Sequence, residues 1–80
     1  MEYLATFHTH FDAVKYHKEI ANMGAKAALR PVPRKLSSSC GSCVSFTYGE
    51  DLPPEQFFTP DVERLYRVTG EDYVLIAEND

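Results

Sequence analysis

Two cysteines three positions apart, Cys40 and Cys43, are the residues of this chain best suited to do chemistry. They lie at the end of the stretch LRPVPRKLSSSCGSC, residues 29–43, which also contains two arginines, two prolines and a run of serines. A CxxC pair has four interpretations: a redox pair, half of a metal site, a carrier thiol beside a bystander, or two structural cysteines. Because the thiolate is the reactive form, the charges and elements around the sulfur atoms help to choose among these.

The surroundings of the cysteines are basic, although the whole chain is acidic. Eight Lys and Arg against twelve Asp and Glu give a net charge of -4, which argues against nonspecific nucleic-acid binding. Residues 20–49 nevertheless contain no acidic residue and half of the eight cations, namely Lys26, Arg30, Arg34 and Lys35. We therefore expect a local positive potential around the cysteines, although solvated loop charges are the commoner case.

The first elements that must position the cysteines are a strand and a helix. Residues 2–8 are rich in strand-forming residues and predict a short first strand. A helix over residues 11–23 follows, with Thr9 as its cap, Asp12 in the capping-box position and Gly24 as its stop. The stripe that this helix is expected to bury contains Ala13, Val14, His17, Ile20, Ala21 and Gly24. His17 is therefore interpreted as a packed core or boundary residue.

Two further strands flank the cysteines. Residues 27–33 predict a second strand, and its prolines confine it to a sheet edge or end it early, because proline cannot donate to the ladder. Residues 43–48 alternate between apolar and small or polar side chains, as a strand with one buried face does. After residue 48, the proline-rich stretch leaves room for one short helical segment around residues 54–58.

The tail of the chain has two interpretations. Thr59 as a cap, Pro60 at the first helical position and a closing glycine are typical of a helix over residues 60–69. The β-branched and aromatic content instead favours a hairpin of residues 62–68 and 73–78 that turns at TGED.

This order of elements predicts one α+β domain over residues 1–80, a ferredoxin-like sandwich. Its sheet would be antiparallel or mixed, with one long helix and a short, proline-broken second helix. A right-handed crossover makes the first two strands parallel, so the third strand begins where the first one ends. Cys40 would then lie near the helix N-terminus, His8 or His10, and Arg34 or Lys35, and these surroundings favour a thiolate.

The runs PVPRKLSSSCG, TFHTHFDAVKYHK and VERLYRV resemble the small bacterial and archaeal family called selenium/sulfur carrier-like, or domain of unknown function 3343. The resemblance covers nearly the whole chain and favours the hairpin for the tail. Its most specific part is matched by Pro31, Pro33, Arg34, Ser38, Ser39, Cys40 and Gly41. It implies a domain linked to sulfur or selenium handling. Cys43 is not part of the family pattern, and the segment after the third strand is broken by prolines where relatives resemble a regular helix.

Two interpretations of the CxxC pair are disfavoured by its context. A thioredoxin-type pair opens a helix, whereas CGSC runs into a strand, so disulfide exchange is not favoured. A zinc site would need two more ligands, which His8 and His10 could supply only from the end of the first strand. No metal and no other cofactor are predicted.

We therefore predict a sulfur or selenium carrier-like accessory protein that presents the thiolate of Cys40, with Cys43 as a candidate second thiol. Its partners would be donor and acceptor proteins, not nucleic acid or membrane, and homodimer formation is left open. The residues predicted to bind an anion or a partner are Arg34, Lys35, Ser38, Ser39, Gly41, His8 and His10. The alternatives are an anion- or partner-binding regulatory module, in which Cys40 is incidental, and a dithiol redox protein. With no complete catalytic constellation, a self-sufficient enzyme is not predicted.

The location predicted from the sequence is the cytoplasm. The chain has no leading basic segment followed by an apolar run, and no stretch near the roughly 20 apolar residues that span a bilayer. With 44% hydrophobic and 25% charged residues, its composition is that of a folded domain.

Overall fold

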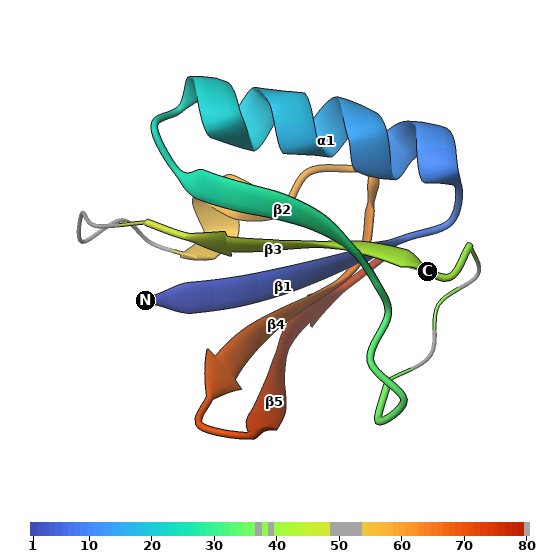
Figure 1. Ribbon diagram of the computed structural model, residues 1–80, viewed down its shortest axis with the longest axis vertical. Coiled ribbons are helices and arrows are strands. Elements are labelled where there is room, and N and C mark those ends of the chain that lie inside the picture. The colour runs from blue at the N-terminus through green and yellow to red at the C-terminus, as the bar shows by residue number, and fades with distance from the viewer. Residues whose placement is uncertain (37, 39, 49–53, 80) are drawn as a thin grey trace.

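The structure is a computed structural model that describes residues 1–36, 38, 40–48 and 54–79. Within these residues, one α-helix lies across one face of a five-stranded sheet (Figure 1). The elements in chain order are strand β1 (Glu2–Phe7), helix α1 (His10–Asn22), strands β2 (Lys26–Pro31) and β3 (Ser42–Thr47), the short 3-10 helix η1 (Pro54–Phe57), and strands β4 (Val62–Thr69) and β5 (Asp72–Glu78). The strand order is β2-β3-β1-β4-β5, and every neighbouring pair is antiparallel.

Helix α1 covers His10–Asn22, one residue earlier at each end than the predicted residues 11–23, and its cap and stop are the predicted residues. The Thr9 hydroxyl accepts a hydrogen bond from the Asp12 amide at 3.1 Å, which satisfies one of the free donors of the first turn. At the other end Gly24 has a φ of 94°, a conformation that stops a helix and that glycine adopts without strain. The predicted cap and stop are therefore confirmed.

The buried stripe of α1 differs from the predicted one. Ala13, Tyr16 and Ile20 are buried, whereas Ala21 and Gly24 are exposed. The predicted stripe left out Tyr16 and was wrong in this respect. The Tyr16 ring lies 5.0 Å from the ring of Phe7 and 5.9 Å from that of Phe46. These aromatic contacts fill the space between helix and sheet, which an alanine at position 21 could not do.

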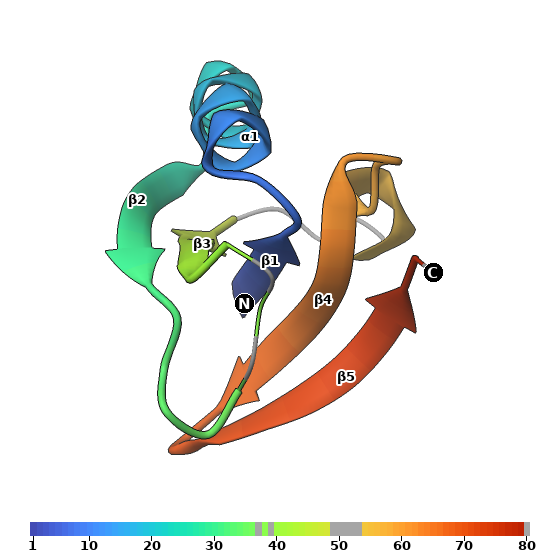
Figure 2. The same cartoon turned by 90° about the vertical axis from the view of Figure 1, so that its right-hand side faces the viewer.

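The two faces of the sheet bury different residues. On β1, Tyr3, Ala5 and Phe7 face α1 and belong to the main core. Leu4 points to the opposite face, where it packs with Cys43 of β3 and Tyr66 of β4 in a smaller cluster. This alternation follows from the period of two along a strand. We call the face opposite α1 the open face, because no helix of the described residues covers it (Figure 2).

The predicted positions of the first three strands are confirmed. Strand β3 lies between β1 and β2, and it begins beside the end of β1, where Cys43 pairs with Thr6. Strand β2 ends at Pro31 and forms an edge of the sheet, as its prolines require.

The tail is a hairpin, and the alternative helix over residues 60–69 is wrong. Strands β4 and β5 pair antiparallel, and Thr69 lies opposite Asp72 across a turn of two residues. Gly70 at the first central position has a φ of 61°, as a type II′ turn requires. Strand β4 also pairs with β1, so its β-branched and aromatic residues are held by a neighbour on both sides.

The α+β class with one long helix is confirmed, but the ferredoxin-like sandwich is not. The described residues hold only the 3-10 turn η1 where a short second helix was predicted, and β5 adds a fifth strand. The Phe58 amide donates to the Glu55 carbonyl at 3.2 Å, and Pro60 lacks the amide hydrogen that a continuing helix needs. Residues 49–53 of this connection lie outside the described residues. No helix in the described part is long and apolar enough to cross a membrane.

Candidate functional site around Cys40

The loop between β2 and β3 lies at the same end of the molecule as the N-terminus of α1 (Figure 1). The Val32 amide donates to the Gly41 carbonyl at 3.0 Å, which ties the start of the loop to its end. The Ser38 hydroxyl donates to the Phe7 carbonyl at 3.0 Å and so fixes the loop to the end of β1. Gly41 has a φ of 74°, which other residues rarely adopt. The predicted meeting of loop and strand end is therefore observed.

Cys40 is a partly buried residue with polar groups around its sulfur. Its amide donates to the Ser38 hydroxyl at 3.4 Å, and its thiol donates to the Ser42 carbonyl at 3.6 Å. The Ser38 hydroxyl also lies 4.0 Å from the Cys40 sulfur. The side chain packs against the edge of the core on the α1 side of the sheet. The loop therefore orients this thiol while leaving it within reach of solvent.

Cys43 lies in different surroundings from Cys40. It is fully buried in the small cluster of the open face, and its thiol donates to the Pro31 carbonyl at 3.6 Å. Burial raises the pKa of the Cys43 thiol to about 11, against the opposing effect of the Arg30 guanidinium. Cys43 is therefore a neutral thiol at physiological pH, and it packs in a different cluster from Cys40. These observations do not favour the dithiol alternative.

The two predicted histidines lie near different partners. His10 Nδ1 is 3.1 Å from the Ser42 hydroxyl oxygen, so the first turn of α1 contacts the first residue of β3, two residues beyond Cys40. His8 Nδ1 is 3.4 Å from a carboxylate oxygen of Glu63 on β4. Glu63 is itself a buried residue. Among the described residues, no group of three or more His, Cys, Asp or Glu side chains is placed to hold a metal ion.

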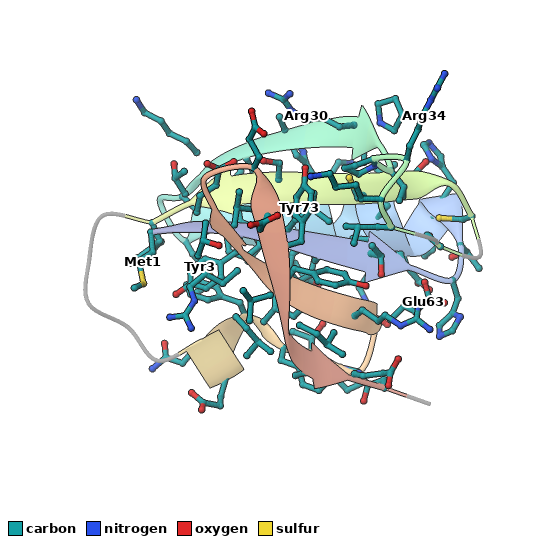
Figure 3. All side chains as sticks on the ribbon, turned by 90° about the horizontal axis from the view of Figure 1, so that it is seen from below. Met1, Tyr3, Arg30, Arg34, Glu63 and Tyr73 are labelled. Carbon is teal, nitrogen blue, oxygen red and sulfur yellow. The ribbon has the colours of Figure 1, made fainter. Side chains whose placement is uncertain are left out.

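The two predicted cations do not converge on Cys40. The Lys35 ammonium donates to the Glu71 carbonyl at 3.0 Å and lies 4.0 Å from an Asp72 carboxylate oxygen, so it contacts the β4–β5 turn. The loop and this turn meet at the bottom of Figure 2. Arg34 is exposed, and its side chain extends away from the sheet (Figure 3). Ser39, also predicted in the site, lies outside the described residues.

Sequence reasoning missed two residues that complete these contacts. Ser42 offers its hydroxyl to His10 and its carbonyl to Cys40, and Glu63 faces His8. Ser42 directly precedes the predicted third strand, and the topology already placed the start of that strand near the histidines. That signal could have identified Ser42. Glu63 carried no such signal, because its place depends on the choice between hairpin and helix in the tail.

Residues 2–54, more than half of the chain, match the family described as "Putative Se/S carrier protein-like". The match runs from β1 through the loop that contains Cys40 and strand β3, which contains Cys43, to the first residue of η1. Strands β4 and β5, whose first segment contributed to the resemblance, lie outside it. Comparison with curated proteins and with solved structures found no match. The resemblance seen in the sequence is confirmed, and the chain belongs to the Se/S carrier-like family.

Proposed function

We propose that this protein accepts a sulfur or selenium atom on Cys40 and passes it to a partner. The observation that supports the proposal best is the contrast between the two thiols. Cys40 is partly exposed in an anchored loop, whereas Cys43 is fully buried and held protonated. Only Cys40 is thus available to a macromolecular donor in the folded state. Membership of the carrier-like family points to the same chemistry.

The loading step is a thiol–persulfide exchange. The Cys40 thiolate attacks the outer sulfur of a donor persulfide, R–S–SH, and the donor's S–S bond breaks. The bond electron pair leaves with the donor as R–S⁻, and Cys40 keeps the outer sulfur as Cys–S–SH. No external oxidant or reductant is needed, because the transferred sulfur keeps its oxidation state. An acceptor thiolate then repeats the attack on the outer sulfur and releases Cys40.

The neighbours of Cys40 have separate roles in this proposal. The Ser42 carbonyl accepts the thiol hydrogen bond and so sets the direction of the sulfur before it is deprotonated. The Ser38 hydroxyl, 4.0 Å from the sulfur, can donate to the thiolate once it forms. His10 supports Ser42 from α1, whose N-terminus carries a partial positive charge. Arg34 remains the proposed contact for an anionic or acidic partner, because it is an exposed residue of the loop.

Intact-mass measurement after incubation with glutathione persulfide tests the proposal. The wild-type protein and the matched variant Cys43→Ala should each gain the mass of one sulfur atom, and a thiol reductant should remove it. Cys40→Ser should gain none. A gain on Cys40→Ser that equals the wild-type gain would contradict the assignment to Cys40. A loss of loading in Cys43→Ala, with circular dichroism showing an intact fold, would support the dithiol interpretation instead.

A further inference from the structure

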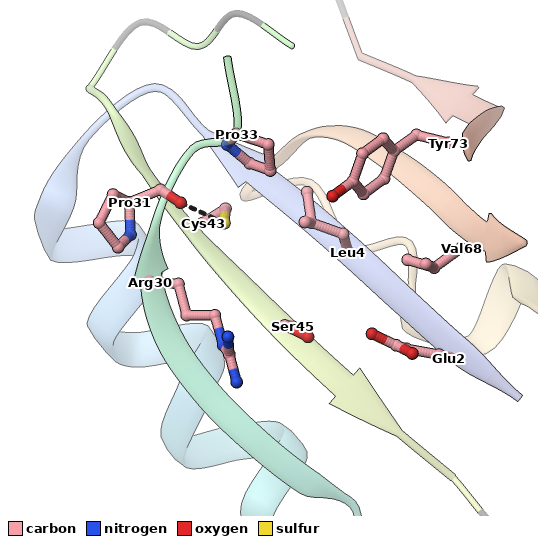
Figure 4. A pocket seen from close by; sticks show the side chains of 9 residues that line it. All are labelled: Glu2, Leu4, Arg30, Pro31, Pro33, Cys43, Ser45, Val68 and Tyr73. Atoms are coloured by element: carbon pink, nitrogen blue, oxygen red, sulfur yellow. Dashed lines mark hydrogen bonds between the residues drawn. The ribbon is translucent and has the colours of Figure 1, made fainter. Parts of the chain in front are cut away.

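The open face of the sheet contains a hollow that is not part of the Cys40 site. Its volume is about 310 Å³, which is at the lower end of the range for small-molecule pockets. Its walls come from β1, β2, β3, the start of the loop and the β4–β5 hairpin (Figure 4). The lining residues are Glu2, Leu4, Arg30, Pro31, Pro33, Cys43, Ser45, Val68 and Tyr73. The size fits a metabolite of a few heavy atoms and not a nucleotide or a folded peptide.

Two opposite charges face this hollow without pairing. Arg30 and Glu2 lie on either side of Ser45, and both side chains are directed toward it (Figure 4). Within the described residues neither has an ion-pair partner. The strand register explains why these two side chains do not form an ion pair. Arg30 pairs with Cys43 at one end of β3, whereas Glu2 pairs with Thr47 at the other end. The hollow thus offers a cation and an anion separated by a hydroxyl.

The other part of the hollow is mainly apolar. Leu4, Val68 and Pro33 line it, and the Tyr73 hydroxyl points inward between Leu4 and Pro33 (Figure 4). Cys43 lies at its base and is neutral because burial raises its pKa. No charged side chain of the described residues lines this part. It therefore suits an uncharged group of the ligand.

We propose that this hollow binds a free α-amino acid with an uncharged side chain. Its carboxylate would accept hydrogen bonds from the Arg30 guanidinium, which matches a carboxylate in a two-pronged geometry. Its ammonium group would donate to the Glu2 carboxylate and to the Ser45 hydroxyl. Its side chain would extend over Leu4 toward Pro33 and Tyr73. A zwitterion fits because it satisfies both unpaired charges, whereas a simple anion or amine satisfies only one.

This site is separate from the proposed carrier thiol. Cys40 packs on the α1 side of the sheet, whereas the hollow lies on the open face. Cys40→Ser should therefore bind the amino acid as wild-type protein does. The failure of either proposal can be recognised without reference to the other.

Titration of the full chain with three matched compounds tests the inference. L-Leucine carries both charges, isocaproate lacks the amino group, and isoamylamine lacks the carboxylate. Measured by NMR chemical-shift changes, L-leucine should bind at least about tenfold more tightly than either analogue, because each analogue leaves one charge unpaired. The shifted amides should include those of Ser45 and Tyr73. Equal binding of isocaproate and L-leucine, or no shift with L-leucine at millimolar concentration, would overturn the proposal.

Substitutions give a second, independent measurement. Arg30→Met and Glu2→Gln should each weaken L-leucine binding at least about tenfold. Lys18→Met removes an exposed cation of α1 on the other side of the sheet and should change the affinity less than twofold. If Lys18→Met weakens binding as much as Arg30→Met does, the effect comes from net charge and the site is wrong. If a variant does not fold, the three-compound comparison on wild-type protein still decides.

Discussion

Cys43 should be alkylated much more slowly than Cys40, and the burial of Cys43 sets the size of the difference. The residue is fully buried, and burial raises its pKa from 9.0 to about 11. Arg30 lies beside it on β2 and favours the thiolate, but the cost of burying a charge is larger. At pH 7 a pKa of 9.0 leaves about 1% of a thiol ionised, whereas a pKa of about 11 leaves about 0.01%. The thiolate fraction of Cys43 should therefore fall about 100-fold on folding.

The same shift makes folding stability depend on pH. Because the folded pKa is raised, the folded chain holds the Cys43 proton more tightly than the unfolded chain does. This contribution is fully present below about pH 9 and is lost as the pH rises toward about 11. Two pKa units correspond to about 3 kcal/mol of unfolding free energy. The stability difference between wild-type protein and Cys43→Ala should therefore decrease by about 2 kcal/mol between pH 8 and pH 11, because half of the folded thiols are still protonated at pH 11.

Alkylation by iodoacetamide measures the decrease in the thiolate fraction of Cys43, and urea denaturation measures the pH dependence of the folding stability. In Cys40→Ser, which leaves Cys43 as the single thiol, the native protein should react about 100-fold more slowly at pH 7 than the same chain unfolded in urea. A native rate within threefold of the unfolded rate would refute the burial of Cys43. A stability difference between wild-type protein and Cys43→Ala that stays constant from pH 8 to pH 11 would refute its raised pKa.

Three further predictions concern the elements that hold the site in place, and urea denaturation measures each of them. Tyr16→Phe should cost about 1–2 kcal/mol, because the Tyr16 hydroxyl donates at 2.6 Å to the carbonyl of Phe57, a buried residue. Thr9→Ala should cost about 1 kcal/mol through loss of the helix cap, whereas Thr9→Ser should cost little. Gly70→Ala should cost about 1 kcal/mol because of the positive φ, and Gly70→Asn should cost less. Equal losses of stability in Thr9→Ala and Thr9→Ser would contradict the cap assignment, and equal losses in Gly70→Ala and Gly70→Asn would contradict the turn assignment.

The parts of the fold that sequence predicted well are those with local causes. The bounds of α1 follow from Thr9 and Gly24, which act within one turn of the helix. The faces of β3 follow from alternation, which places Val44 toward α1 and Cys43 away from it. The tail remained ambiguous because it carries both a helix cap and strand-forming residues. Pairing of β4 with β1 resolves it, and no local pattern in residues 62–69 records that contact.

The candidate site was predictable as a meeting of segments but not as a set of contacts. Topology alone brought the cysteine loop to the N-terminus of α1. The partners of individual side chains depend on distant elements, as the contact between Lys35 and the β4–β5 turn shows. The depth of Cys43 depends on Val32 and Leu36, which pack against its cluster from the loop. The packing of these side chains over Cys43 is a tertiary contact, so sequence alone could not distinguish a buried Cys43 from a half-exposed one.

The acid-free segment predicted one positive region around both cysteines, but strand geometry divides its charges. The period of two along β2 places Lys26 and Arg30 on the same side of the strand, and Arg30 lies beside Cys43. Lys35 contacts the hairpin turn, whereas the side chain of Arg34 extends away from the sheet. The cation proposed to contact a partner of Cys40, Arg34, and the cation that lines the hollow, Arg30, are therefore different residues.

This division predicts that the two proposed activities respond to different substitutions. Arg34→Ala should slow persulfide loading of Cys40 by a few-fold at low salt, and added salt should reduce the difference, because exposed charges are screened. It should leave L-leucine binding unchanged. Arg30→Met should weaken L-leucine binding and leave the loading rate unchanged. If either substitution lowers both quantities to the same extent in a folded protein, the charges act through one shared potential and the assignment of separate roles is wrong.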